Sequence, residues 1–144
     1  MGLIQVQQLQ KKLDYTSNRV KSISKRHGFD GWAIINLYPE RSLHPNKLSR
    51  ILDKEAHEQN MEEIKLLLEK YNPESVWVAW GTSIEKRKYL KFCLNDITQL
   101  LLKNNVKCLH LGDLTNEGHP KHPRIAMNND NFYNFDIGNY IKRW

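Results

Sequence analysis

The chain alternates between continuous apolar runs and segments in which apolar residues recur every three or four positions. Continuous runs predict strands buried on both faces, and they cover residues 32–37, 76–80 and 106–111, with a further short candidate at 3–6. Spacing of three and four predicts helices. The predicted helices are 16–27, the stretch that carries Met61 to Leu68 and ends at Asn72-Pro73, the stretch from Gly81-Thr82-Ser83 to Asn104-Asn105, and a closing helix over 131–144. Residues 43–53 are predicted to be a loop with a short helix.

Buried strands that alternate with helices indicate an α/β fold with a mostly parallel sheet. We therefore predict that the three long apolar runs are parallel neighbours in one sheet, with helices on both faces, as a three-layer sandwich. The length of 144 residues suits one domain, and the sequence shows no repeat or linker. Residues 1–144 are accordingly predicted to form a single domain.

Polar clusters follow each predicted strand. The first contains Asn36, Arg41 and His44, the second is Gly81-Thr82-Ser83, and the third is the loop from His119 to Arg124. Ligands of parallel sheets bind beyond the carboxyl ends of the strands. We therefore expect all three clusters at one rim, around one cleft.

The third cluster has the most distinctive chemistry. It reads Gly118-His119-Pro120-Lys121-His122-Pro123-Arg124, with two His-Pro pairs in seven residues. Proline restricts its own backbone and that of the preceding residue, so both imidazoles are held in restricted directions. Such a loop could bind an anion, orient a leaving group or bind a metal. The alternative is an ordinary surface turn.

The amino-acid composition indicates which classes of partner the chain is expected to bind. The formal net charge of +6 and the pI near 9.3 favour an anionic partner, with nucleic acid or a nucleotide first. The lysines are spread along the chain, which is also typical of solvated helix faces. Cys93 and Cys108 fall in apolar segments, so neither a disulfide framework nor a zinc site is predicted. We predict no cofactor, no bound metal and no membrane span, and a cytoplasmic protein.

Most candidate residues also have a structural alternative. Asn36 could instead cap a turn beside Pro39. Arg41 could instead form an ordinary surface ion pair with Glu40 or Asp53. Trp80 suits the core as well as a stacking platform.

The helix start after Trp80 has two interpretations. Thr82 and Ser83 suit an N-cap, and the same helix end suits an anion. Near the His-Pro loop, Asp113 and Glu117 are the acids available as a general base, unless a residue across the rim serves.

Several of these residues together resemble the domain of unknown function 1643, a bacterial and phage family. The resemblance rests on Gly28, Asn36-Leu37, Arg41 with Pro45, Asn60, Trp80-Gly81 and Gly118-His119-Pro120-Lys121-His122-Pro123. It runs from about Asp14 to the C-terminus and implies a compact α/β domain. The family opens with a strand ending in Asn-Pro-Ser, which is missing here, so residues 1–13 are divergent or truncated relative to it.

More distantly, the order of elements resembles the uracil-DNA glycosylase superfamily. That resemblance implies a uracil-DNA-glycosylase-like fold, in which Asn36 reads the base and His119 or His122 supplies the imidazole. Arg124 or Lys121 would then contact phosphate. The turn that activates water in glycosylases has no equivalent in residues 3–9.

Two functions follow from these observations. The first is binding of a nucleotide, nucleobase or nucleic acid at the rim, with hydrolysis of an N-glycosidic bond left open. The alternative is a non-catalytic interaction protein of phage–host conflict that keeps the rim and has lost the catalytic first motif, with a protein as partner.

Overall fold

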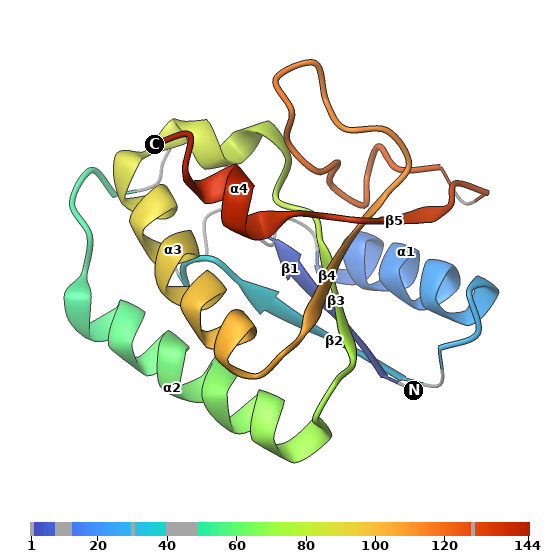
Figure 1. The fold of residues 1–144 in the computed structure, drawn as a ribbon, viewed down its shortest axis with the longest axis horizontal. Helices are drawn as coiled ribbons and strands as arrows, with labels where there is room; N and C mark the ends of the chain where they lie inside the picture. Colours follow the sequence, from blue (N-terminus) through green and yellow to red (C-terminus); the bar gives the residue numbers. More distant parts are fainter. Residues whose placement is uncertain (1, 8–12, 30, 40–48, 128) are drawn as a thin grey trace.

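The computed structural model describes residues 2–7, 13–29, 31–39, 49–127 and 129–144, drawn in Figure 1. Its strands are β1 (Gly2–Gln7), β2 (Gly31–Asn36), β3 (Ser75–Val78), β4 (Lys107–Leu111) and β5 (Phe132–Asn134). Its helices are α1 (Leu13–Arg26), α2 (Lys54–Tyr71), the 3-10 helix η2 (Gly81–Lys86), α3 (Lys88–Lys103) and α4 (Ile137–Ile141). The protein therefore has a mixed α/β fold, as the alternating pattern predicts. Arg41, His44 and most of the predicted 43–53 loop lie outside the described residues.

Within the described residues, five strands form one sheet in the order β2-β1-β3-β4-β5. The first four are parallel, and β5 pairs antiparallel with β4. The prediction that the three long runs are parallel is confirmed, but the prediction that they are all neighbours is wrong. β1 lies between β2 and β3, because Ile4 pairs with Ala33 on one side and with Val76 on the other.

The C-terminal segment also differs from its prediction. Residues 131–144 were expected to form one helix, whereas they form β5 and then the short helix α4. Phe132 pairs with Leu111 of β4, which takes the first part of the segment into the sheet. The Asp136 carboxylate then accepts a hydrogen bond from Asn139 N at 3.0 Å, so the helix begins only after this cap.

Both faces of the sheet are covered, and β3 shows how. Val76 and Val78 pack in a core cluster with α2, α3 and α4, whereas Trp77 and Ala79 pack in a second cluster with α1. This alternation is the two-residue period of a strand. Figure 1 shows α2 and α3 together on one side of the strands and α1 on the other.

The cysteines are buried in this core, as predicted. Cys93 lies in α3 and Cys108 in β4, both as free thiols, and burial raises the pKa of each to about 12. Within the described ranges, no helix is long and apolar enough to cross a membrane.

Candidate functional site

The ends of β3 and β4 meet at the carboxyl edge of the sheet. Trp80 and Gly81 follow β3, and the His-Pro loop, which we define as residues 118–124, follows β4. Gly81 N donates a hydrogen bond to Pro120 O at 2.8 Å. Gly81 has a φ of +64°, a conformation that glycine adopts without strain, and a Cβ added there would lie 3.5 Å from His122 Cβ. The two predicted clusters are therefore in direct contact.

A hydrogen-bonded chain fixes His119 beneath this edge. Trp80 Nε1 donates to the Tyr140 hydroxyl at 2.9 Å, and that hydroxyl lies 2.6 Å from His119 Nδ1. Indole can only donate, so the hydroxyl keeps its own hydrogen available for His119 Nδ1, and the Glu85 carboxylate 3.4 Å from Nε2 favours the tautomer that accepts this hydrogen. The ring proton of His119 is then on Nε2. All three side chains are buried, and His119 is 0 % exposed.

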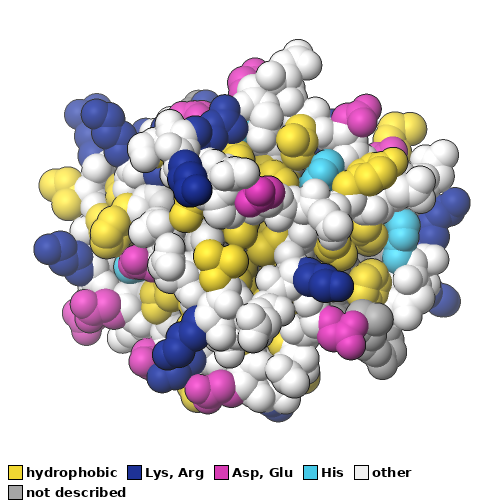
Figure 2. All heavy atoms as spheres, in the orientation of Figure 1, with side chains coloured by type: hydrophobic (Ala, Val, Ile, Leu, Met, Phe, Trp, Pro, Cys, Tyr) yellow, Lys and Arg dark blue, Asp and Glu magenta, His cyan; other side chains and the backbone are white. Residues whose placement is uncertain are grey.

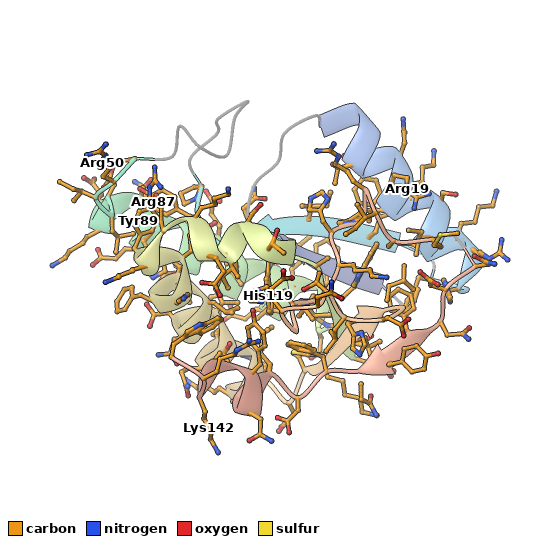
Figure 3. The ribbon with its side chains drawn as sticks, turned by 90° about the horizontal axis from the view of Figure 1, so that it is seen from above. Arg19, Arg50, Arg87, Tyr89, His119 and Lys142 are labelled. Atoms are coloured by element: carbon orange, nitrogen blue, oxygen red, sulfur yellow. The ribbon has the colours of Figure 1, made fainter. Side chains whose placement is uncertain are left out.

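The Nε2 of His119 faces a carboxylate. It lies 3.4 Å from Glu85 Oε1, while Lys91 Nζ lies 2.8 Å from Glu85 Oε2. The hydrogen bond from Lys91 lowers the pKa of Glu85, and burial lowers the pKa of His119. The arrangement is thus a neutral imidazole beside an ionised carboxylate whose side chain is 47 % exposed. Figure 3 shows His119 near the centre of the molecule, with the labelled arginines toward its edges.

Two arginines contact the backbone in and beside the His-Pro loop. Arg143, just after α4, donates from Nη2 to Glu117 O at 2.7 Å, and its guanidinium lies 5.2 Å from the centre of the Tyr140 ring. Arg19 of α1 donates from Nε to Pro123 O at 3.1 Å and from Nη2 to Ala126 O. Arg19 of α1 therefore holds the backbone at the end of the loop, and Arg143 holds the backbone of the residue just before it.

Asn36 lies at the same edge but apart from the loop. β1 separates β2 from β3, so at the usual strand spacing Asn36 is roughly 10 Å from the axis of β3. Its backbone oxygen accepts a hydrogen bond from Asn60 Nδ2 at 2.9 Å, and its Oδ1 is buried without a partner within the described structure. Asn36 therefore lies at the carboxyl edge of the sheet, but it does not belong to the contact network of the histidines.

The remaining candidates differ in exposure. Lys121 and His122 are half-buried, and Thr82 and Arg124 are exposed. Arg124 N donates to His122 Nδ1 at 3.2 Å, so this ring nitrogen carries no hydrogen. The N-cap expectation for Thr82 and Ser83 is wrong, because η2 begins at Gly81 and has no side-chain cap. A six-residue 3-10 helix of this kind offers little dipole to an anion.

The conserved-domain comparison decides the family. The family model for proteins of unknown function (DUF1643) matches residues 6–124. The chain belongs to the DUF1643 family. The matched residues of this DUF1643 protein include Asn36, Trp80-Gly81 and the whole His-Pro loop, whereas α4 lies beyond them. Comparison with curated proteins and with solved structures finds no match.

Two side chains beside His119, those of Glu85 and Tyr140, were not predicted from the sequence. Glu85 stands in the charged stretch Glu85-Lys86-Arg87-Lys88, which has the pattern of an ordinary solvated segment. Tyr140 fell in the predicted closing helix, where an aromatic residue is expected to fill the core. Only the fold places both beside His119. Among the described residues, no cluster of three or more His, Cys, Asp or Glu side chains is arranged to hold a metal ion.

The low pKa of His119 predicts a pH-dependent stability of the DUF1643 protein. Burial is the main cause, Arg143 adds to it, and Glu85 opposes it. Because the folded pKa lies below the ordinary 6.5, the unfolded chain binds the proton first as the pH falls. The contribution of His119 to the free energy of unfolding should therefore be constant above about pH 7.5 and decline below about 6.5, by at most about 1.4 kcal/mol per pH unit for this one proton.

His119→Gln should remove this contribution, as measured by urea unfolding at several pH values. His110, whose pKa burial also lowers, remains in that variant and retains its own slope. A His119→Gln variant with an unchanged slope between about pH 7 and 5 would contradict the assignment of the buried neutral ring.

Proposed function

We propose that this DUF1643 protein binds a nucleotide, a nucleobase or nucleic acid at the carboxyl edge of its sheet, with the His-Pro loop as one wall. The observation that carries the proposal is the fixed position of this loop. Gly81 N, Tyr140 and Arg19 all hold it, while Lys121, His122 and Arg124 remain at least partly accessible. Cations on a preorganised loop bind phosphate without the cost of ordering the loop.

The proposal includes a uracil-DNA-glycosylase-like, three-layer fold. It is supported by a mostly parallel sheet with helices on both faces and by a His-Pro loop after β4. In this arrangement Asn36 contacts the base, and Lys121, Arg124 and Arg41 contact phosphate. A cytoplasmic location, supported by two unpaired buried thiols, is part of the same proposal.

The catalytic form of this function is hydrolysis of an N-glycosidic bond. An imidazole N–H near a base carbonyl stabilises the negative charge that develops there as the bond breaks, and a base in duplex DNA must first be extruded. His122 is the better placed of the two histidines to touch a ligand, because His119 is fully buried. His119, held between Tyr140 and Glu85, would then position the loop.

The number of Lys and Arg side chains that contact phosphate sets how strongly oligonucleotide affinity depends on salt. Figure 2 shows Lys and Arg side chains scattered over the face of the molecule that it presents rather than gathered in one dense patch. Three phosphate contacts, from Arg41, Lys121 and Arg124, should make the logarithm of oligonucleotide affinity fall with the logarithm of salt concentration at a slope of roughly −2 to −3. Arg124→Ala should reduce that slope by about one unit and leave base preference unchanged.

Fluorescence anisotropy across salt concentrations measures this slope for single- and double-stranded oligonucleotides. Lys103→Ala is the matched control, because Lys103 is exposed at the end of α3, next to the amino end of β4 and so toward the edge of the sheet opposite the loop. No binding at low salt would remove nucleic acid from the proposal. Release of uracil, hypoxanthine or an alkylated base that His122→Ala abolishes would establish the hydrolase form.

A second function is favoured by a different observation. The segment between β4 and β5 exposes large apolar side chains, with Ile125 at 60 % and Met127 at 61 %. Exposed apolar groups around a basic loop suit a protein surface as partner. If the protein has this non-catalytic function, we expect oligonucleotides either not to bind at low salt or to bind without release of a base.

A further inference from the structure

The ring of His119 lies between two separate elements of the fold. Its Nδ1 lies 2.6 Å from the hydroxyl of Tyr140 in α4, and its Nε2 lies 3.4 Å from Oε1 of Glu85 in η2. The residue is 0 % exposed, and Nε2 makes no hydrogen bond within the described residues. The two ring nitrogens therefore connect the His-Pro loop to α4 and to η2 respectively.

The neutral ring favours the contact with α4. Its unprotonated Nδ1 accepts the hydrogen of the Tyr140 hydroxyl, while the hydroxyl oxygen accepts from Trp80 Nε1 at 2.9 Å. The Nε2–H group faces Glu85 at 3.4 Å, which is longer than the usual N–H···O distance of about 2.7–3.2 Å. The neutral ring therefore makes a short contact with the hydroxyl and a poor one with the carboxylate.

Protonation of Nδ1 reverses this preference. The new hydrogen points at the Tyr140 oxygen, so the hydrogen of the hydroxyl must turn away. Within the described residues the hydroxyl has no third hydrogen-bond partner, and a buried donor without an acceptor is costly. At the same time the ring becomes a cation beside the carboxylate of Glu85, whose pKa the hydrogen bond from Lys91 holds low.

The other charged groups around the ring also act on the C-terminal segment. Burial lowers the pKa of His119 most, and Arg143 and Lys91 lower it further. Glu85 and Glu117 oppose them. A positive ring repels Arg143, whose Nη2 fastens the segment after α4 to Glu117 O at 2.7 Å. The same proton therefore weakens both the hydroxyl contact and the arginine contact.

We propose that His119 is a pH-sensitive switch, which fastens the His-Pro loop to α4 when the ring is neutral and to η2 when it is protonated. In acid the imidazolium pairs with Glu85, and residues 137–144 detach from the loop. The hydrogen bond from Gly81 N to Pro120 O does not involve the ring, so the loop stays attached at the end of β3. The inference goes beyond the proposed function, because it concerns how the loop is held and not what it binds.

Hydrogen exchange measured by NMR between about pH 7.5 and 4.5 tests the switch, with rates expressed relative to those of an unstructured peptide. The amides of Tyr140 and Lys142, which donate to Asp136 O and Asn139 O, should lose protection by up to about tenfold per pH unit below the pKa of the ring. They should stay less protected than Gly81 N and the amides of β3, which identifies a local opening.

Three variants separate the ring from its surroundings. His119→Gln should abolish the pH dependence of exchange in α4. Glu85→Gln should move its onset to a lower pH by about one unit, because the imidazolium loses its carboxylate. His110→Gln is the matched control. Burial also lowers the pKa of His110, but its ring contacts Tyr133 and Phe135, so α4 should keep its pH dependence.

Nitrogen-15 NMR of the natural chain tests the ring itself, with hydrogen expected on Nε2 alone at about pH 7.5 and gained on Nδ1 in acid. The proposal is overturned if Nδ1 carries hydrogen at neutral pH, if protection in α4 is independent of pH, or if that dependence persists in His119→Gln. It is also overturned if Gly81 N loses protection together with α4. Oligonucleotide binding at neutral pH does not require the switch, so its failure would count against the proposed function alone.

Discussion

Tyr140→Phe should lower the free energy of unfolding by about 2–4 kcal/mol. The hydroxyl is the acceptor for Trp80 Nε1 and the partner of His119 Nδ1, and all three side chains are buried. Its removal leaves two buried polar atoms without partners, and each costs about 1–3 kcal/mol. Urea denaturation with tryptophan fluorescence measures the loss.

The control for this prediction is Tyr71→Phe, which removes a hydroxyl from a residue that is 59 % exposed at the end of α2. It should change stability by less than about 0.5 kcal/mol. Trp80→Phe should also cost less in the Tyr140→Phe background than in the natural chain, because the indole N–H has already lost its acceptor. Additive effects of the two changes would refute the hydrogen-bonded chain.

Gly112→Ala should be nearly as costly, at about 2–4 kcal/mol. Gly112 begins the segment after β4 with a φ of +67°, and a Cβ there would lie 2.6 Å from Asp130 Oδ2 and 2.8 Å from Asp130 Cγ. Moving the Asp130 side chain away breaks the hydrogen bond that its Oδ2 accepts from Met127 N at 2.9 Å. Backbone strain and a displaced turn therefore add together.

Thermal unfolding compares this variant with Gly31→Ala. Gly31 has no atom within 4 Å of an added Cβ and no positive φ, so its replacement should be neutral or slightly stabilising. Gly112→Ala with an unchanged melting temperature would show that the segment between β4 and β5 has an alternative packing.

The strands that the sequence predicts best are those buried on both faces. Val76, Trp77 and Val78 all face core, so an unbroken apolar run marked β3 without ambiguity. The position of β1 could not be found in the same way. Periodicity identifies a strand, but the order of strands depends on which edges pair, and that choice is made by tertiary packing.

The site was predictable where strand ends determine it. Trp80-Gly81 and the His-Pro loop follow neighbouring parallel strands, so their contact follows from topology. The separation of Asn36 follows from the unexpected place of β1. Glu85 and Tyr140 carry no signal of their own, because their roles depend on which side of His119 each helix lies.

The central place of β1 also has a kinetic consequence. As the chain leaves the ribosome, β1 and β2 can pair early, but the other edge of β1 stays open until β3, about 70 residues later, is available. An unpaired edge is a template for association with other chains. An interruption of synthesis before β3 has been made should therefore favour aggregation. An interruption after β3 should favour it less, because the strand that closes this edge of β1 is then already present.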